Sequence, residues 1–63
     1  MEKLVLFKRF DVYATTSYSN YNSLIQDANK ITKFPSMTKQ EVIKTLTNWG
    51  IANEEDIIDC TGE

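Results

Sequence analysis

Residues 36–51 read SMTKQEVIKTLTNWGI and carry the most complete set of helix signals in the chain. Thr38 and Glu41 have the spacing of a capping box, in which each side chain binds the free backbone N–H of the other residue. Apolar side chains then recur at helical spacing and form one stripe, at Val42, Ile43, Leu46 and Trp49. The sequence therefore predicts a helix that begins after Thr38 and packs one face against the rest of the chain.

The two ends of this stretch define how the chain enters and leaves the helix. Met37 lies where it can pack on Val42 and fix the entry. Gly50 can adopt the left-handed conformation of a Schellman stop, which allows Ile51 to fold back onto Leu46. The helix is therefore expected to end at Gly50.

The residues before this helix predict a second helix and a loop. Pro35 prevents a preceding helix from continuing and favours an extended Phe34. Between residues 21 and 33 the apolar side chains recur at helical spacing, so a helix is expected there, with Asn20 or Asn22 as its N-cap. The polar run 14–20 has the composition of a loop or of a ragged second strand.

The N-terminal run from residue 3 to residue 13 is rich in Leu, Val, Phe and Tyr and predicts a strand. Alternation places one set of apolar side chains on one face (Leu4, Leu6, Phe10 and Val12) and another on the other (Val5, Phe7 and Tyr13). Two helices that cover one face leave Val5 and Phe7 for a second subunit or a partner. The alternative is a bulge near Lys8 and Arg9 that turns the second half of the strand over.

The chain after Ile51 admits two interpretations. Asn53 can cap one helical turn through Asp56. Residues 56–61 can instead form a short strand beside the first one, which we favour because an isolated strand is unstable. The fold class is therefore α+β: a single small domain over residues 1–63, in the order strand, helix, helix, and short strand or helical turn, which dimerisation can complete.

Composition narrows the cellular setting. The chain has 63 residues, so its core is thin. A single cysteine cannot form an internal disulfide, and without histidine a structural metal site is hard to build. Self-association is the remaining route to added stability. No apolar run approaches the roughly 20 residues of a membrane span, and the unpaired Cys60 fits a reducing compartment. We expect a cytoplasmic protein. The excess of lysine over arginine fits an AT-rich genome, such as that of a low-GC bacterium or its phage.

The residues that catalysis, metal binding and phosphate binding require are missing or poorly placed. Nucleophilic catalysis needs a base beside a thiol or hydroxyl, and the acids around Cys60 oppose thiolate formation. The two glycines, Gly50 and Gly62, are too far apart for a phosphate-binding loop, and no calcium-loop pattern is present. We expect no enzymatic activity, no catalytic residue, no cofactor and no metal.

Charge is distributed unevenly and suggests where a partner binds. The segment 53–63 contains five carboxylates and no basic residue, for a formal charge of −5, whereas the rest of the chain has seven basic and four acidic residues. We therefore expect a non-enzymatic protein-binding module, a small regulator or inhibitor that occupies a surface of a larger protein. Its contacts to a basic partner surface are expected from the terminal acids and two tyrosines, namely Glu54, Glu55, Asp56, Asp59, Tyr18 and Tyr21. Homodimerisation is expected through Val5 and Phe7.

The order strand, helix, helix in about sixty residues resembles the ribbon-helix-helix repressors, and residues 36–49 are similar to the second helix of that family. In that family two chains pair their strands and insert them into the major groove of DNA. The resemblance implies a dimeric DNA-binding regulator that uses Lys3, Arg9 and the helix lysines, and this is the alternative function. The loop 14–20, Pro35 and the negative charge depart from the family pattern, so nucleic acid is the less favoured partner.

Overall fold

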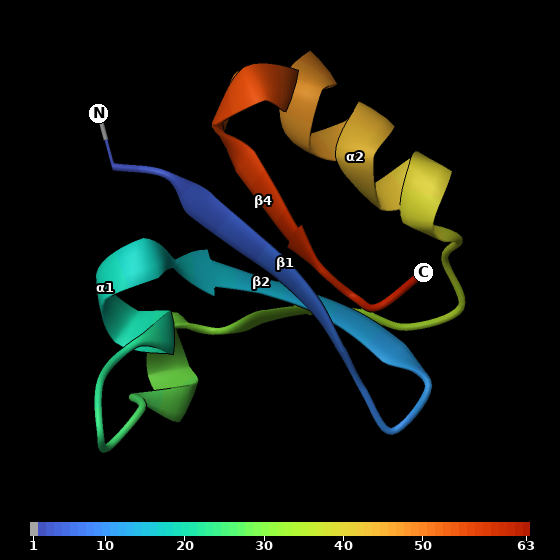
Figure 1. Ribbon diagram of the computed structural model, residues 1–63. Coiled ribbons are helices and arrows are strands. Elements are labelled where there is room, and N and C mark those ends of the chain that lie inside the picture. Colours follow the sequence, from blue (N-terminus) through green and yellow to red (C-terminus); the bar gives the residue numbers. More distant parts are fainter. Residues whose placement is uncertain (1) are drawn as a thin grey trace.

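The computed structural model describes residues 2–63, and in it a four-stranded β-sheet carries one longer helix and several short helical turns (Figure 1). The sheet order is β3-β2-β1-β4. Strand β1 pairs antiparallel with β2 and parallel with β4, and β2 pairs antiparallel with β3. The strands span Leu4–Arg9 (β1), Val12–Ser17 (β2), Thr32–Phe34 (β3) and Ile57–Cys60 (β4). The α+β class is confirmed.

The N-terminal apolar run forms a β-hairpin. Phe10 and Asp11 connect β1 to β2, and both have left-handed backbones, with φ of 53° and 64°. Two consecutive left-handed residues are the signature of the turn that suits the twist of a two-residue hairpin. The prediction of one strand over residues 3–13 was wrong, because the chain reverses at this turn. The alternative, a bulge near Lys8 and Arg9, was also wrong, since the second half of the run is turned over by the hairpin. Tyr13 consequently lies on the face of Leu6 and not on that of Val5 and Phe7.

The helix predicted after Thr38 is confirmed at both ends. Helix α2 spans Lys39–Asn48, and Thr38 and Glu41 form the complete capping box. The Thr38 hydroxyl accepts a hydrogen bond from the Glu41 N–H at 3.2 Å, and the Glu41 carboxylate accepts one from the Thr38 N–H at 3.0 Å. Gly50 is left-handed, with φ of 70°, and the Ile51 N–H donates to the Leu46 carbonyl at 3.1 Å, which is the Schellman bond.

The helix predicted over residues 21–33 was wrong. The chain there forms a short helix α1, Tyr18–Tyr21, a loop, a 3₁₀ turn η1, Ala28–Lys30, and the edge strand β3. A polar network explains the difference. The buried Asn20 side chain binds the hydroxyl of Thr16, and it also binds the backbone N–H and carbonyl of Asp27. Side-chain bonds to the backbone compete with helical ones, and here they hold the loop against β2.

Both interpretations of the C-terminal segment occur in succession. Residues Glu54–Asp56 form a 3₁₀ turn, η2, and Ile57–Cys60 form strand β4 beside β1, as favoured from the sequence. Val5 lies opposite Ile58 and Phe7 opposite Cys60 in the parallel ladder. The first strand thus has a neighbour on each side within the chain, an arrangement that differs from the strand-helix-helix order of the ribbon-helix-helix repressors.

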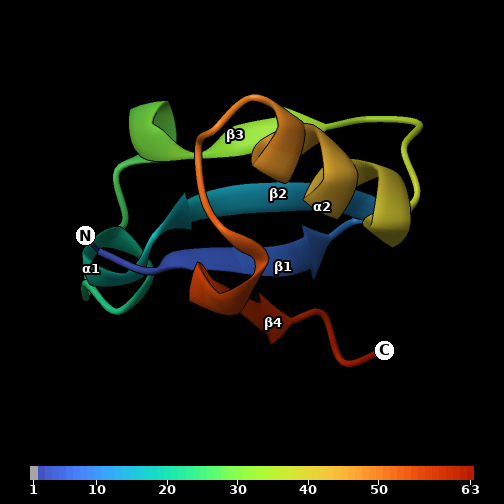
Figure 2. The same ribbon diagram turned by 90° about the horizontal axis from the view of Figure 1, so that it is seen from above.

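Two apolar clusters lie on opposite faces of the sheet. Figures 1 and 2 show α2 across one of these faces. Helix α2 covers one face, and the cluster there contains Leu6, Tyr13, Phe34, Val42 and Leu46. On the other face Val5, Phe7 and Ala14 are covered in part by Tyr21, Ile31 and Ile58. Val5 and Phe7 are only 1% and 8% exposed. The expectation that helices leave these two side chains bare was wrong, because the segment between β2 and β3 and the added strand β4 cover them.

Within residues 2–63 there is no helix with both the length and the apolar character needed to cross a membrane.

Candidate functional site

A groove of about 430 Å³ opens on the sheet face opposite α2. This volume lies within the range of roughly 300–1,000 Å³ that is usual for ligand pockets. Most of its lining is apolar, and two cations complete it; the lining residues are Phe7, Arg9, Phe10, Val12, Ala14, Ala28, Ile31 and Lys33. The groove is therefore shaped by the hairpin, by the 3₁₀ turn η1 and by the start of β3.

The floor of the groove follows from the register of the hairpin. Phe7 on β1 and Ala14 on β2 are directly paired, and both are buried. Because alternate residues of a strand share a face, Arg9 lies on the same face as Phe7, and Val12 on that of Ala14. The small Ala14 side chain leaves the space that a larger residue at this position would occupy.

Hydrogen bonds fix the far wall of the groove, which the segment 28–33 provides. The Thr16 hydroxyl donates to the Lys30 carbonyl at 2.9 Å, and the Asn20 amide donates to the Thr16 hydroxyl at 2.8 Å. The Asp27 carboxylate caps η1 by accepting from the Asn29 N–H at 3.0 Å. This wall is consequently attached to β2 and is preformed for a ligand.

The rim of the groove carries unpaired positive charge. Arg9 and Lys33 are exposed, and neither forms an ion pair with any residue between 2 and 63. Phe10 is 89% exposed at the hairpin tip, and the Arg9 guanidinium lies 5.8 Å from its ring centroid. An apolar floor with a cationic rim is complementary to a ligand that carries an apolar group next to a carboxylate.

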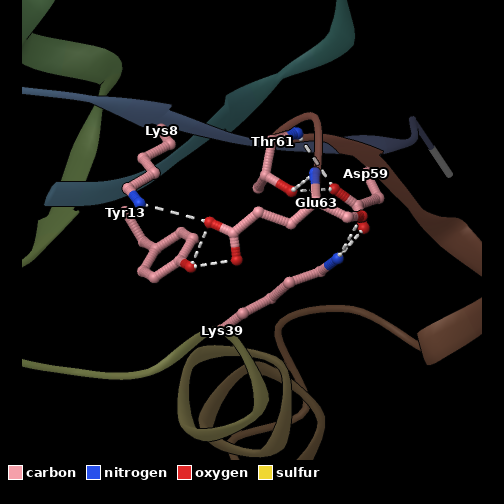
Figure 3. Close-up of polar contacts among 6 residues, drawn as sticks. All are labelled: Lys8, Tyr13, Lys39, Asp59, Thr61 and Glu63. Atoms are coloured by element: carbon pink, nitrogen blue, oxygen red, sulfur yellow. Dashed lines mark hydrogen bonds and ion pairs between the residues drawn. The ribbon is translucent and has the colours of Figure 1, made fainter. Parts of the chain in front are cut away.

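A second polar cluster surrounds Glu63 (Figure 3). The Tyr13 hydroxyl donates to the Glu63 carboxylate at 2.6 Å, and Lys8 Nζ lies 3.2 Å from the same carboxylate. These partners lower the pKa of Glu63, the Tyr13 hydrogen bond most and Lys8 next. The bond to Glu63 likewise raises the pKa of Tyr13 and of Lys8. Every member of this cluster is engaged within the chain, so it stabilises the fold and offers no free group for chemistry.

The four acids expected to bind a partner have different surroundings. Asp59 forms an ion pair with Lys39 and accepts from Thr61, and Lys39 holds the pKa of Asp59 down at about 2. Asp56 lies 3.8 Å from Lys3 Nζ. Among the described residues, Glu54 and Glu55 form no ion pair, and both are exposed on η2. Of these four acids, only Glu54 and Glu55 therefore lack an ion pair within residues 2–63. Lysines from distant parts of the sequence pair with the other two.

The two tyrosines expected as anchors lie at the far end of the sheet from the hairpin tip. Tyr18 is half-exposed, and its N–H donates to the carbonyl of Lys3, whose side chain contacts Asp56. Tyr21 is partly buried and stacks at a tilt on Phe7, with ring centroids 5.4 Å apart. Tyr18 and the acidic turn therefore share one end of the sheet, whereas Tyr21 is mainly a cover for the second apolar cluster.

Other candidate chemistry is dispersed. Cys60 is a free, exposed thiol. In residues 2–63, no three acidic or thiol side chains gather closely enough to hold a metal ion. Lys8 and Lys39 are engaged with acids on the α2 side of the sheet, away from Arg9 and Lys33.

The groove was not predicted from the sequence. Its cations, Arg9 and Lys33, lie 24 positions apart, and only the hairpin and β3 bring them together. The available signal was Asp11 between two apolar runs, since aspartate tolerates a left-handed turn. Recognition of that turn would have placed Phe7 opposite Ala14.

Comparison with known proteins identifies no relative: no protein-family model, no curated protein and no solved structure matches this chain.

Proposed function

We propose that the protein is a non-enzymatic binding module, a small cytoplasmic regulator or inhibitor of the kind that phages encode, and that it engages a larger protein through the groove. The groove is the single observation that carries the proposal, because it joins a preformed apolar floor to two cations that form no ion pair within residues 2–63. The ligand that fits it is a protein segment with an exposed apolar or aromatic side chain followed by carboxylates.

The two parts of the groove contribute differently to binding. Burial of an aromatic anchor on Phe7, Val12 and Ile31 supplies most of the affinity, since a few central apolar contacts dominate protein interfaces. Arg9 and Lys33 on the rim attract the acidic part of the partner and set its register, and rim charges act mainly on the association rate. Affinity should therefore fall with salt, but only moderately.

Capture from cytosol tests this proposal. The tagged protein and its variants Arg9→Glu, Lys33→Glu and Lys44→Glu are each incubated with host cytosol, with and without nuclease treatment. Each variant changes the charge by the same amount, and Lys44 is an exposed helix lysine outside the groove that forms no ion pair with the described residues. We expect one stoichiometric protein that the wild type and Lys44→Glu retain and the two groove variants lose. Equal retention by all four proteins contradicts the proposal, and recovery that requires nucleic acid favours the DNA-binding alternative.

A further inference from the structure

The connection between α2 and β4 presents an apolar and acidic surface of its own. Trp49 is 71% exposed and Ile51 is 47% exposed, although both are large apolar side chains. Glu54 and Glu55 follow within a few residues and form no ion pair with any residue between 2 and 63. We call these four side chains the knob. It has the chemistry that the groove fits, an aromatic side chain followed by carboxylates.

The knob is held in shape by the fold. The left-handed Gly50 turns the chain at the end of α2, and the Ile51 N–H donates to the Leu46 carbonyl. Ala52 is buried directly after it, and the Asp56 N–H donates to the Asn53 carbonyl at 2.9 Å, which forms the turn that displays Glu54 and Glu55. A preorganised surface loses little conformational entropy when it binds.

We propose that the groove of one copy of this chain binds the knob of a second copy. Trp49 and Ile51 would cover the apolar floor, and Glu54 and Glu55 would pair with Arg9 and Lys33. This inference rests on the proposed function, because it uses the same groove. It adds that the protein itself presents a competing ligand, so that self-association limits access of the larger partner at high concentration.

The topology requires two copies. Helix α2 lies on one face of the sheet (Figures 1 and 2). The residues that line the groove place it on the other face. A knob at the end of α2 cannot reach the groove of its own chain while the sheet stands between them. The contact joins unlike surfaces. Because the knob and the groove of one copy lie on opposite faces of the sheet, one partner does not engage both at once, and the contact generates rings or open chains. Each added copy presents one free groove and one free knob.

Sedimentation of two complementary variants tests the inference. Arg9→Glu with Lys33→Glu removes the cations of the groove and leaves the knob, whereas Trp49→Ala with Glu54→Gln and Glu55→Gln removes the knob and leaves the groove. The wild type should show a mass that rises with concentration beyond a dimer. Each variant alone should remain a monomer, and their equimolar mixture should form a one-to-one heterodimer and no larger species, because only one groove and one knob remain. All altered side chains are exposed, and circular dichroism of each variant checks that it is folded.

Two results overturn the inference: a wild type that stays a monomer up to about 1 mM, where an association with a millimolar dissociation constant is detectable, or variants that each still self-associate. Leu24→Ala, which removes a fully exposed apolar side chain outside both surfaces, is the matched control and should assemble as the wild type does. The capture experiment distinguishes the two proposals. If the wild type is a monomer and Arg9→Glu loses the cytosolic partner, the self-association inference is wrong and the proposed function stands. If the wild type and the variants assemble as predicted but the groove variants lose no cytosolic partner, the proposed function is wrong and the self-association inference stands.

Discussion

The hydroxyl of Tyr13 donates to both carboxylate oxygens of Glu63, at 2.6 and 2.7 Å, across a separation of 50 positions in the sequence. The contact joins the start of β2 to the residue that follows β4 and its turn (Figure 3). Lys39 at the start of α2 adds a bond from its Nζ to the Glu63 carbonyl at 3.3 Å. Hairpin, helix and C-terminal segment are thus connected at one end of the molecule, although β4 itself is an edge strand of only four residues.

Tyr13→Phe should lower the free energy of unfolding by about 1 kcal/mol, measured by urea denaturation. A hydrogen bond to a charged group contributes roughly 1.5–3 kcal/mol when buried, and the exposure of Glu63 reduces that amount. Tyr18→Phe is the control, since the Tyr18 hydroxyl forms no hydrogen bond among the described residues. An equal loss in both variants would show that the contact to Glu63 contributes nothing.

Acidification should destabilise the protein over a defined range of pH. The pKa of Asp59 is lowered to about 2, and that of Glu63 is lowered as well. A depressed carboxyl pKa contributes stability above its unfolded value, near 4, and that stability is lost as pH falls through the folded value. The midpoint of thermal unfolding should therefore decrease between about pH 4.5 and pH 2.

Asp59→Asn measures how much of this acid limb comes from Asp59. It should cost up to about 1 kcal/mol at neutral pH, because the pair with Lys39 is partly exposed, and it should flatten the decrease at low pH. Glu54→Gln removes a carboxylate that has no ion pair within residues 2–63 and should leave the profile unchanged. A profile as steep in Asp59→Asn as in the wild type would assign the acid limb to other groups.

Leu46→Ala and Leu24→Ala should differ sharply in stability. Leu46 is 1% exposed in the cluster under α2, whereas Leu24 is fully exposed. Truncation of a buried leucine costs about 2–5 kcal/mol, a large part of the stability of so small a domain. We therefore expect Leu46→Ala to be substantially unfolded at 25 °C by circular dichroism and Leu24→Ala to match the wild type. If Leu24→Ala also unfolds, the loop is packed in solution.

Asp11→Gly should stabilise the hairpin. Asp11 has a φ of 64°, a conformation that costs glycine least. We expect a gain of about 0.5 kcal/mol in urea denaturation, and a loss for Asp11→Val, because a β-branched side chain is strained in this region. Asp11 does not line the groove, so neither variant should alter binding. A loss of stability in Asp11→Gly would contradict the left-handed turn.

Sequence reasoning succeeded where the deciding signals are local. Thr38, Glu41, Gly50 and Ile51 determine both ends of α2 through contacts within a few residues, and the structure confirms each one. It failed where distant residues decide. The helical spacing between residues 21 and 33 is outweighed by the bonds of Asn20 to Thr16 and Asp27, which no periodicity reveals.

The candidate site was predictable to a smaller extent. Acids were expected to act together, but Lys3 and Lys39 pair with Asp56 and Asp59 only in the folded chain. Phe10 has a left-handed backbone, which phenylalanine rarely adopts. The turn therefore lacks the Asn-Gly pair that usually signals a hairpin in a sequence. Without the hairpin, the groove cannot be assembled from the sequence.

The central claim is that the groove is the binding site, and filling it is the most direct test. Ala28 is exposed on the rim of the groove, so Ala28→Trp should occupy the groove without unfolding the chain. Ser23→Trp adds the same side chain at an exposed position outside it. The measurement is the dissociation constant for the partner captured by the wild type, by titration calorimetry. We predict a loss of at least tenfold for Ala28→Trp, about 1.4 kcal/mol, and no change for Ser23→Trp. Equal affinity of the two variants, or the lack of any protein partner retained by the wild type, would contradict the account.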